Sequence, residues 1–256
     1  MSILDRFRLD NRTAFVTGGG QGIGRAIALA LAEAGASVAI MDINEKTAKK
    51  VAEEIKELGR NSLVYVGDVT VAKDCQQAIQ MILDEWGKLD IAVNNAGIGD
   101  WANAETYPED RWMRVINVNL KGVFLCAQAE FKAMAPKKYG KIINIASMSG
   151  HIVNRPQNQS AYNASKAAVI HLTRTLAAEW APYGIRVNSI SPGYIRTPLV
   201  ESPEVRNLVP KWLEWIPLGR LGEVSDIQGA AVFLASEASD YITGHDLVID
   251  GGYTVW

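Results

Sequence analysis

The fold is decided by one stretch of sequence, Thr17-Gly18-Gly19-Gly20-Gln21-Gly22-Ile23-Gly24, which joins a β-branched run to a helix rich in small residues. Glycine permits a tight turn with positive φ and lets the backbone approach a ligand closely. A helix that begins at such a turn offers free N–H groups and a partial positive charge to a phosphate. The stretch therefore predicts a dinucleotide-binding turn, with these residues at the pyrophosphate: Gly18, Gln21, Gly22, Ile23 and Gly24.

Outward from this turn, short β-branched runs alternate with amphipathic helical runs along almost the whole chain. Strands are expected at Thr13–Thr17, Ser37–Met41, Ser62–Val66, Leu89–Asn94, Lys141–Ile145, Arg186–Ile190 and Leu247–Ile249. Helices are expected at Arg25–Ala34, Glu45–Leu58, Lys73–Trp86, Asp110 to about Ala135, Ala161–Trp180 and Val224–Leu234. This order predicts an α/β single-domain Rossmann fold, a doubly wound parallel sheet of about seven strands with helices on both faces. We expect one domain over residues 1–256, with a nucleotide-binding part at about 10–150 and a catalytic and substrate part at about 145–256.

Composition excludes several other classes of protein. Hydrophobic residues make up 48% of the 256 residues, and 26 basic against 28 acidic residues leave a net charge of −2. This balance argues against nucleic acid or an anionic membrane surface as a partner. The N-terminus is mixed and charged, and no apolar run reaches the roughly 18 residues that a membrane span needs. The only two cysteines, Cys75 and Cys126, form no CxxC motif, so a cytoplasmic protein is expected.

An acidic residue, Asp42, ends the second expected strand, 18 positions after Gly24, and Ile43 follows it. A carboxylate there accepts hydrogen bonds from the adenosine ribose and repels a 2′-phosphate. No Lys or Arg lies among residues 18–24 or in the two positions after Asp42 to neutralise that phosphate. The pattern predicts NAD rather than NADP; the alternative is that Asp42 only solvates a strand end.

The only Tyr-x3-Lys in the chain is Tyr162-Asn-Ala-Ser-Lys166, in the expected helix Ala161–Trp180. Residues at i and i+4 share a helix face, so the phenol and the ammonium group can approach each other. A tyrosine pKa near 10 is too high for a base at neutral pH. A neighbouring lysine and an oxidised nicotinamide would both lower it, which predicts Tyr162 as the acid–base group.

The glycine spacing Gly18-x3-Gly22-x-Gly24 together with Tyr162-x3-Lys166 resembles the short-chain dehydrogenase/reductase family, and the resemblance covers essentially the whole chain. Asp68-Val69 looks like that family's adenine contact, and Asn94-Asn95-Ala96-Gly97 looks like its NNAG element. Pro192-Gly193, followed by Ile195 and Thr197, looks like the segment that lies along the nicotinamide carboxamide. The resemblance implies an NAD site whose further members are Asp68, Val69, Asn95, Ala96, Gly97, Tyr162, Lys166, Pro192, Gly193, Ile195 and Thr197.

The family pattern adds a serine and an asparagine to the catalytic set. Ser147 directly follows an expected strand, where the family's serine lies; Ser149 fits the usual distance to the tyrosine and is the alternative. Counting back from Gly122-Val-Phe matches Asn119 to the catalytic asparagine, with a structural role for Asn117.

The chemistry expected of this set is the oxidation of a secondary alcohol. Tyr162 takes the hydroxyl proton as hydride leaves for the nicotinamide, and Ser147 holds the substrate oxygen. Lys166 lowers the tyrosine pKa and binds the nicotinamide ribose, and Asn119 fixes a water that links Lys166 to solvent. No metal site is expected, because His151, His171 and His245 show no ligand spacing.

The substrate is the least determined feature. The segment Ser147–Gln157 and the tail Asp250–Trp256 resemble the polyol dehydrogenase branch of the family, which implies a polyol or ketose substrate. We expect these side chains at the substrate: Ser147, Ser149, Asn154, Gln157 and Tyr162, with His151 as a further candidate. Alternatively, this amide-rich loop only contacts water.

The last expectations concern a lid, the assembly and rival functions. Leu199–Trp215 is expected to form a mobile lid in which Trp212 and Trp215 cap the substrate or pack the helix.

Family members are commonly homotetramers, and the resemblance implies the same here. The rival readings are a 3-oxoacyl thioester reductase, against which Asp42 argues, and a catalytically idle NAD sensor, against which the complete catalytic set argues.

Overall fold

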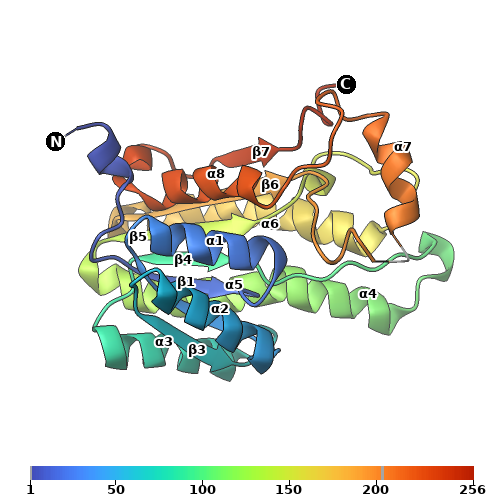
Figure 1. Cartoon of the computed structure of the whole chain (residues 1–256). Coiled ribbons are helices and arrows are strands. Elements are labelled where there is room, and N and C mark those ends of the chain that lie inside the picture. Colours follow the sequence, from blue (N-terminus) through green and yellow to red (C-terminus); the bar gives the residue numbers. More distant parts are fainter. Residues whose placement is uncertain (1, 203–204) are drawn as a thin grey trace.

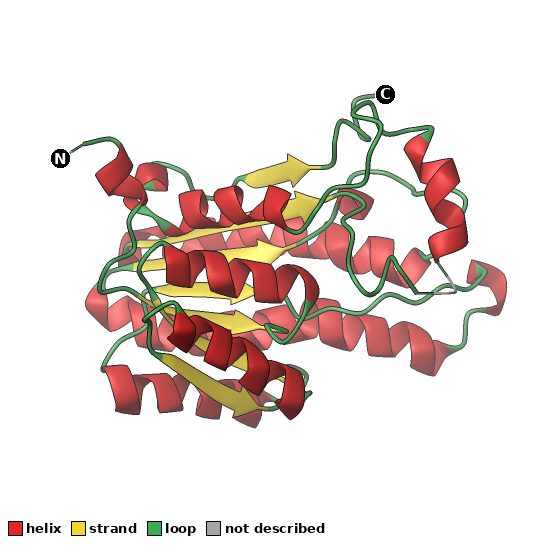
Figure 2. Cartoon of the chain, viewed as in Figure 1, coloured by secondary structure: helices red, strands yellow, loops and turns green. Residues whose placement is uncertain are grey.

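Seven parallel strands form one sheet in the order β3-β2-β1-β4-β5-β6-β7 (Figure 1). This computed structural model describes residues 2–202 and 205–256. The strands are β1 (Thr13–Thr17), β2 (Ser37–Asp42), β3 (Ser62–Val66), β4 (Ile91–Asn94), β5 (Gly140–Ile145), β6 (Ile185–Pro192) and β7 (Asp246–Ile249). All strand arrows point toward the side of the molecule where α7 (Val209–Leu213) lies (Figure 2). The carboxyl ends of the strands therefore meet at one edge, where ligands bind in open α/β sheets.

Helices cover both faces of the sheet, as a parallel sheet requires. One face is covered by α1 (Gly22–Glu33), α2 (Glu45–Glu57) and α8 (Ser225–Ala235). The other is covered by α3 (Ala72–Trp86), α5 (Gly122–Met134) and α6 (Ser160–Trp180), with α4 (Glu109–Ile116) leading into α5. The predicted doubly wound Rossmann fold is thus confirmed, and the sheet runs without a break through both predicted parts of the domain.

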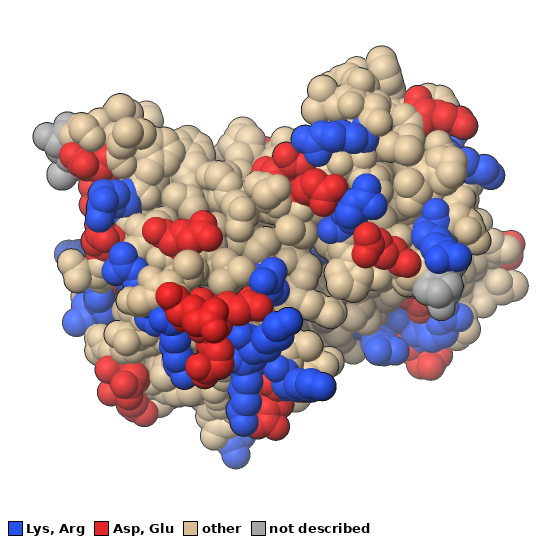
Figure 3. Space-filling view, viewed as in Figure 1, with Lys and Arg blue, Asp and Glu red and all other residues tan. Residues whose placement is uncertain are grey.

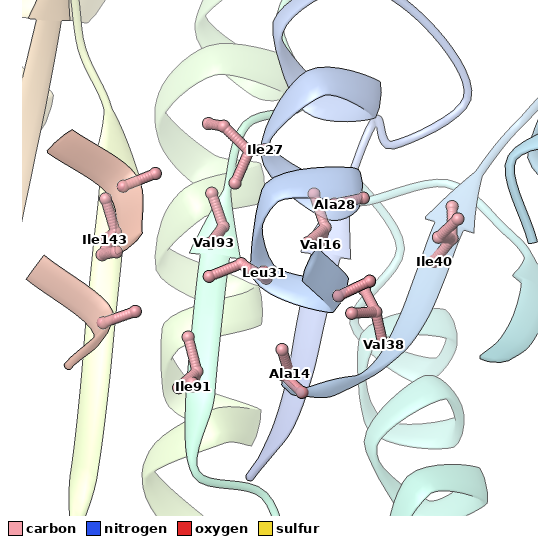
Figure 4. Close-up of a cluster of buried hydrophobic side chains, with 14 of the residues drawn as sticks. Ala14, Val16, Ile27, Ala28, Leu31, Val38, Ile40, Ile91, Val93 and Ile143 are labelled. Atoms are coloured by element: carbon pink, nitrogen blue, oxygen red, sulfur yellow. The ribbon is translucent and has the colours of Figure 1, made fainter. Parts of the chain in front are cut away.

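Successive residues of the strands point to opposite faces, which divides the core in two. In β1, Ala14 and Val16 pack against α1, whereas Phe15 packs with the helices of the opposite face. Figure 4 shows Ile27, Ala28 and Leu31 of α1 above the side chains of β1, β2 and β4. Because every strand side chain in the centre of the sheet is covered, the strand sequences are apolar at consecutive positions rather than alternately polar.

Shorter elements complete the chain. They are 3₁₀ turns at Leu4–Phe7, Ala104–Thr106, Ala135–Lys137, Met148–Gly150, Ala181–Tyr183, Arg206–Leu208 and Glu237–Ser239. Residues 203–204 of the predicted lid lie outside the described residues, and the rest of Leu199–Trp215 contains Arg206–Leu208 and α7. The predicted mobility of this lid stays a prediction.

Two of the differences from expectation have clear physical reasons. Helix α1 begins at Gly22 rather than Arg25, because the Arg25 N–H already donates to the Gln21 carbonyl at 3.1 Å. The expected continuous helix from Asp110 is interrupted by a π-helical turn, Asn117–Lys121, between α4 and α5. Such turns widen a helix by one residue and are frequent at functional sites.

Charges of both signs intermingle on the face that Figure 3 shows. On α2, for instance, Lys49 pairs with Glu45 at 2.6 Å and Lys56 with Glu53 at 2.8 Å. Within the described part of the chain, no helix is long and apolar enough to cross a membrane.

Candidate active site

A cavity of about 730 Å³ opens at the carboxyl ends of the strands. It extends from the glycine turn after β1 past the ends of β2, β4 and β5 to the segment after β6. Nearly all residues predicted to bind the cofactor line it: Gly18, Gln21, Gly22, Ile23, Asp42, Ile43, Asp68, Val69, Asn95, Ala96, Gly97, Tyr162, Lys166, Pro192, Gly193, Ile195 and Thr197. The predicted substrate residues Ser147, Ser149, Asn154 and Gln157 line the same cavity. Gly24 and Asn119 are not among the residues that line it.

The glycine turn is shaped by backbone requirements that other residues do not meet. Gly18 and Gly22 have φ values of +61° and +56°, in the left-handed region. A Cβ on Gly24 would lie 2.2 Å from the Gly18 carbonyl oxygen and 2.4 Å from Asn95 Nδ2. The first turn of α1 therefore packs directly against the turn that precedes it, which leaves the surface of the turn open to the cavity.

Asn95 holds this turn in place. Its Nδ2 donates to the carbonyls of Thr17 at 3.0 Å and Gly18 at 3.1 Å. In return, the Thr17 hydroxyl accepts hydrogen bonds from the backbone N–H groups of Asn95 at 3.0 Å and Ala96 at 3.1 Å. Asn95 thus orders the glycine turn from the neighbouring strand.

Asp42 closes the far end of the turn. Its Oδ2 accepts from the Gly20 N–H and its Oδ1 from the Asn44 N–H, both at 2.9 Å. Its carboxylate lines the cavity next to Ile43, whose side chain is exposed. A fixed negative charge at this place fits a ribose with free hydroxyls better than one that carries a phosphate.

Tyr162, Ser147 and Lys166 converge on the opposite end of the cavity. The Ser147 hydroxyl lies near the Tyr162 phenol, where it opposes the rise in pKa that burial causes. Lys166 Nζ lies 5.7 Å from the centre of the Tyr162 ring and donates to the Ile145 carbonyl at 2.7 Å. The i, i+4 spacing on α6 therefore places both side chains on the cavity side of that helix, as predicted.

The electrostatics of the protein alone differ from the expectation for Tyr162. Removal from water raises the pKa of its phenol above the usual 10, and this effect outweighs the opposing influence of the nearby Ser147 hydroxyl. Burial likewise lowers the pKa of Lys166 to about 8, because the charged form loses its hydration. Lowering of the Tyr162 pKa by the lysine and a positively charged nicotinamide stays a prediction.

Asn119 lies in the π-helical turn, and both polar atoms of its amide are hydrogen-bonded to protein groups. Its Oδ1 accepts from the Ile98 N–H at 2.8 Å, and its Nδ2 donates to the Ile98 carbonyl at 2.9 Å and to Ser165 Oγ at 3.2 Å. A Cβ on Gly97 would lie 3.3 Å from Asn119 Oδ1 and 3.6 Å from Lys166 Nζ. Asn119 thus anchors the strand end beside Lys166, whereas its predicted water remains untested. Asn117 lines the cavity.

The amides of the loop before α6 are bonded to protein groups rather than left free. Asn154 Nδ2 and Gln157 Nε2 both donate to the Tyr194 hydroxyl, at 3.1 and 2.9 Å. Gln157 Oε1 accepts from the Trp212 indole at 3.2 Å. Contact with substrate hydroxyls therefore requires these bonds to be shared or exchanged, and the role of Asn154 and Gln157 at a substrate stays a prediction.

Two aromatic residues of the cavity wall meet here. Trp212 is 1% exposed and stacks on Tyr194 with 3.9 Å between ring centroids. Trp212 also lines the cavity, so it both packs its helix and covers the space, while Trp215 is 50% exposed. The edge of Tyr253, in the C-terminal tail, packs against Tyr194 at 5.3 Å.

Among the lining residues that sequence reasoning missed are Trp101, Gln159 and Tyr194. Tyr194 directly follows Pro192-Gly193, so the sequence did place it next to a segment predicted to border the nicotinamide. Trp101 and Gln159 come together only because the loop after β4 runs beside the segment before α6.

The histidines lie apart from the reacting end. His151 Nε2 pairs with Asp246 Oδ2 at 2.6 Å, which ties the loop after β5 to β7. It does not line the cavity, and its candidate role at a substrate hydroxyl is therefore not supported by its position. His171 and His245 are exposed, and the described residues contain no cluster of three or more potential metal ligands.

Comparison with known proteins places this geometry in context. A family model described as "Enoyl-(Acyl carrier protein) reductase" matches residues 18–254. The chain is 45% identical to a galactitol 2-dehydrogenase of Rhizobium johnstonii, over 100% of both chains. It is 43% identical to a probable NADP-dependent mannitol dehydrogenase of Yarrowia lipolytica, over 98% of this chain and 91% of that one. A crystal structure of a short-chain type dehydrogenase/reductase from Mycobacterium marinum superimposes with a TM-score of 0.96 at 46% identity, covering 99% of each chain.

Gly24→Ala is expected to weaken dinucleotide binding by about tenfold or more, because the new methyl group collides with backbone of the turn. Calorimetric titration with NAD measures this affinity. Gly229→Ala is the matched control: it lies in α8 with no atom within 4 Å of the new Cβ. It should bind NAD like the wild type and be as stable or up to about 1 kcal/mol more stable. Equal binding by both variants would contradict the role assigned to the turn.

Proposed function

The chain belongs to the short-chain dehydrogenase/reductase family, whose members related to it interconvert secondary alcohols and ketones, and we propose that this protein does so with NAD(H) and a sugar alcohol. The observation that carries the proposal is one continuous cavity with Asp42 at one end and Tyr162, Ser147 and Lys166 at the other. A dinucleotide is the ligand whose length and chemistry suit both ends.

Groups suited to each part of a dinucleotide line the cavity along its length. The glycine turn and the start of α1 face the place of the pyrophosphate, and Asp42 faces that of the adenosine ribose. Asp68 and Val69 border the adenine end, and Pro192, Gly193, Ile195 and Thr197 border the nicotinamide end. When bound, the nicotinamide supplies the acceptor or donor of the hydride.

The residues at the reacting end transfer the alcohol proton and position the groups that take part. Tyr162 accepts the alcohol proton at its phenol oxygen, or returns it to the carbonyl oxygen in the reverse direction. Ser147, which lies near that phenol, holds the substrate oxygen within reach of it. Lys166 is held by the Ile145 carbonyl beside Tyr162, and the Asn119 amide fixes the neighbouring backbone of Ile98.

NAD rather than NADP is proposed because of the Asp42 carboxylate, although a related mannitol dehydrogenase is named NADP-dependent. A 2′-phosphate would approach a fixed negative charge with no described Lys or Arg pairing that carboxylate. Like charges in contact disfavour binding.

A sugar alcohol is proposed because the related galactitol and mannitol dehydrogenases span the full chain and because amides border the cavity beside Ser147. A compact secondary alcohol without further hydroxyls is the second candidate. It is favoured by the aromatic wall of Trp101, Tyr194 and Trp212 and by the bonds that already occupy the amides.

A homotetramer in the cytoplasm is also part of the proposal. The outer edge of β7 ends the sheet, and Val255 and Trp256 of the tail are 73% and 72% exposed. Large exposed apolar side chains beside a sheet edge favour contact with another subunit.

Tyr162→Phe is expected to lower kcat by about 100-fold or more, since it removes the acid–base oxygen and little volume. NADH formation on galactitol, mannitol, D-arabinitol, D-sorbitol and cyclohexanol measures the loss. NAD affinity should remain near that of the wild type. A variant that turns over as fast as the wild type would exclude Tyr162 as the proton acceptor.

Asp42→Asn should shift cofactor preference toward NADP by about tenfold or more, because it removes the charge and retains a hydrogen-bond acceptor. The ratio of kcat/KM for NADP to that for NAD, measured with one substrate, reports the shift. A wild type that already prefers NADP would overturn the cofactor proposal and leave the alcohol chemistry in place.

The rate of alcohol oxidation is expected to rise from about pH 7 to pH 10, and that of ketone reduction to be retained at neutral pH. Tyrosine loses its proton above its pKa, and burial raises the pKa of Tyr162. The base form that oxidation needs is therefore favoured by alkali, and the acid form that reduction needs persists at neutral pH. Rate profiles at saturating substrates in both directions test this; oxidation that slows between neutral and alkaline pH in folded protein speaks against it.

A further inference from the structure

Gln159 joins two loops that reach the cavity from different strands. It is the last residue before α6, three positions before Tyr162, and its side chain is only 8% exposed. The Ala102 N–H donates to the Asn158 carbonyl at 3.1 Å, and Ala102 and Gln159 form a parallel bridge. The segment before α6 thus lies beside the loop that follows β4.

The chemistry of its neighbours determines which way the Gln159 amide points. Trp101 Nε1 lies 3.2 Å from Gln159 Oε1, and an indole N–H is a donor only. The oxygen of the amide must therefore face Trp101. The nitrogen then faces acceptors, Ser149 Oγ at 3.3 Å and Asn154 Oδ1 at 3.0 Å, with Asn163 Oδ1 at 2.8 Å.

This orientation leaves the Ser149 hydroxyl able to donate to Ser147. An amide nitrogen only donates, so the Ser149 hydroxyl accepts from Gln159 and keeps its own proton for another acceptor. Ser147 Oγ lies 3.1 Å away and also accepts from the Ser149 backbone N–H at 3.1 Å. In the order Gln159 to Ser149 to Ser147, both lone pairs of Ser147 are occupied and its own proton is free for the oxygen beside Tyr162.

A role of Gln159 in capping α6 does not account for these contacts. Its side chain makes no capping hydrogen bond to the helix, and all of its amide bonds go to other side chains. Each of those side chains except Asn163 lines the cavity.

We propose that Gln159 is a positioning residue for the reaction: its amide directs the Ser149–Ser147 hydroxyl pair so that Ser147 donates to the substrate oxygen, and it holds Trp101 as the opposite wall. The hydroxyl part of this assignment rests on the proposed alcohol–ketone chemistry. The Trp101 part stands independently of any substrate.

Gln159→Glu tests the hydroxyl part, because it keeps the shape and the acceptor for Trp101 but replaces the donor with a carboxylate. At neutral pH, kcat for ketone reduction should fall by about tenfold, the loss of one well-placed hydrogen bond. As the pH falls, the new carboxyl gains a proton and can donate again. The ratio of variant to wild-type kcat should therefore recover toward pH 5, with KM for the dinucleotide unchanged.

Asn158→Asp is the matched control, since it makes the same chemical change one residue away on an exposed side chain that bonds only to Asn103 among the described residues. It should keep wild-type kcat across the pH range. Wild-type kcat in Gln159→Glu, a loss that does not recover at low pH, or an equal loss in Asn158→Asp would each overturn the hydroxyl part.

Fluorine NMR of protein labelled with 5-fluorotryptophan tests the Trp101 part without turnover, with the Trp101 signal assigned by Trp101→Phe. Gln159→Met removes the acceptor and should move that signal, whereas Gln159→Glu and Asn158→Asp should move it little. An unmoved signal in Gln159→Met would overturn the assignment of Trp101. A wild type that reduces no ketone would refute the proposed function and the hydroxyl part. The fluorine signal would still test whether Gln159 holds Trp101.

Discussion

The hydrogen bonds from the Asn95 amide to the carbonyls of Thr17 and Gly18 are the contacts on which the rest of the site depends. They join the carboxyl ends of β1 and β4, the place where the order of strands reverses direction and a crevice opens. On one side of this tie, the glycine turn is held against α1. On the other, the backbone continues through Ala96 and Gly97 to the surroundings of Lys166. A single amide therefore fixes the distance between the nucleotide end and the catalytic end of the cavity.

Burial governs the chemistry of the catalytic end. Removal from water disfavours the phenolate of Tyr162 and the ammonium of Lys166 alike, which raises the pKa of the first and lowers that of the second to about 8. The protein alone thus holds both groups closer to neutrality than water would. A positive charge beside them would then act in a medium that screens it weakly, so its effect on the phenol would be large.

The substrate end combines polar groups with little free hydrogen-bonding capacity. Tyr194 accepts from two amides, and its ring packs between Trp212 and Tyr253, so the lid, the loop before α6 and the C-terminal tail meet at one side chain. Buried polar networks that are nearly satisfied are rigid. Selectivity of this cavity consequently depends on its shape and on which of these bonds a substrate can exchange, and less on the number of amides near it.

The sequence by itself determined the doubly wound sheet, the glycine turn, Asp42 at the end of β2 and the Tyr162–Lys166 pair, because each depends on local periodicity or on spacing within one element. Only the tertiary structure decided that Ser147 meets the Tyr162 phenol, that Asn119 occupies a π-helical turn, and that Gln159 lies beside Trp101. It also showed that Asn154 and Gln157 are bonded to Tyr194 and that His151 pairs with Asp246 outside the cavity. These contacts join loops from different strands, and their distances depend on how the sheet twists and the helices pack, which spacing along one chain does not encode.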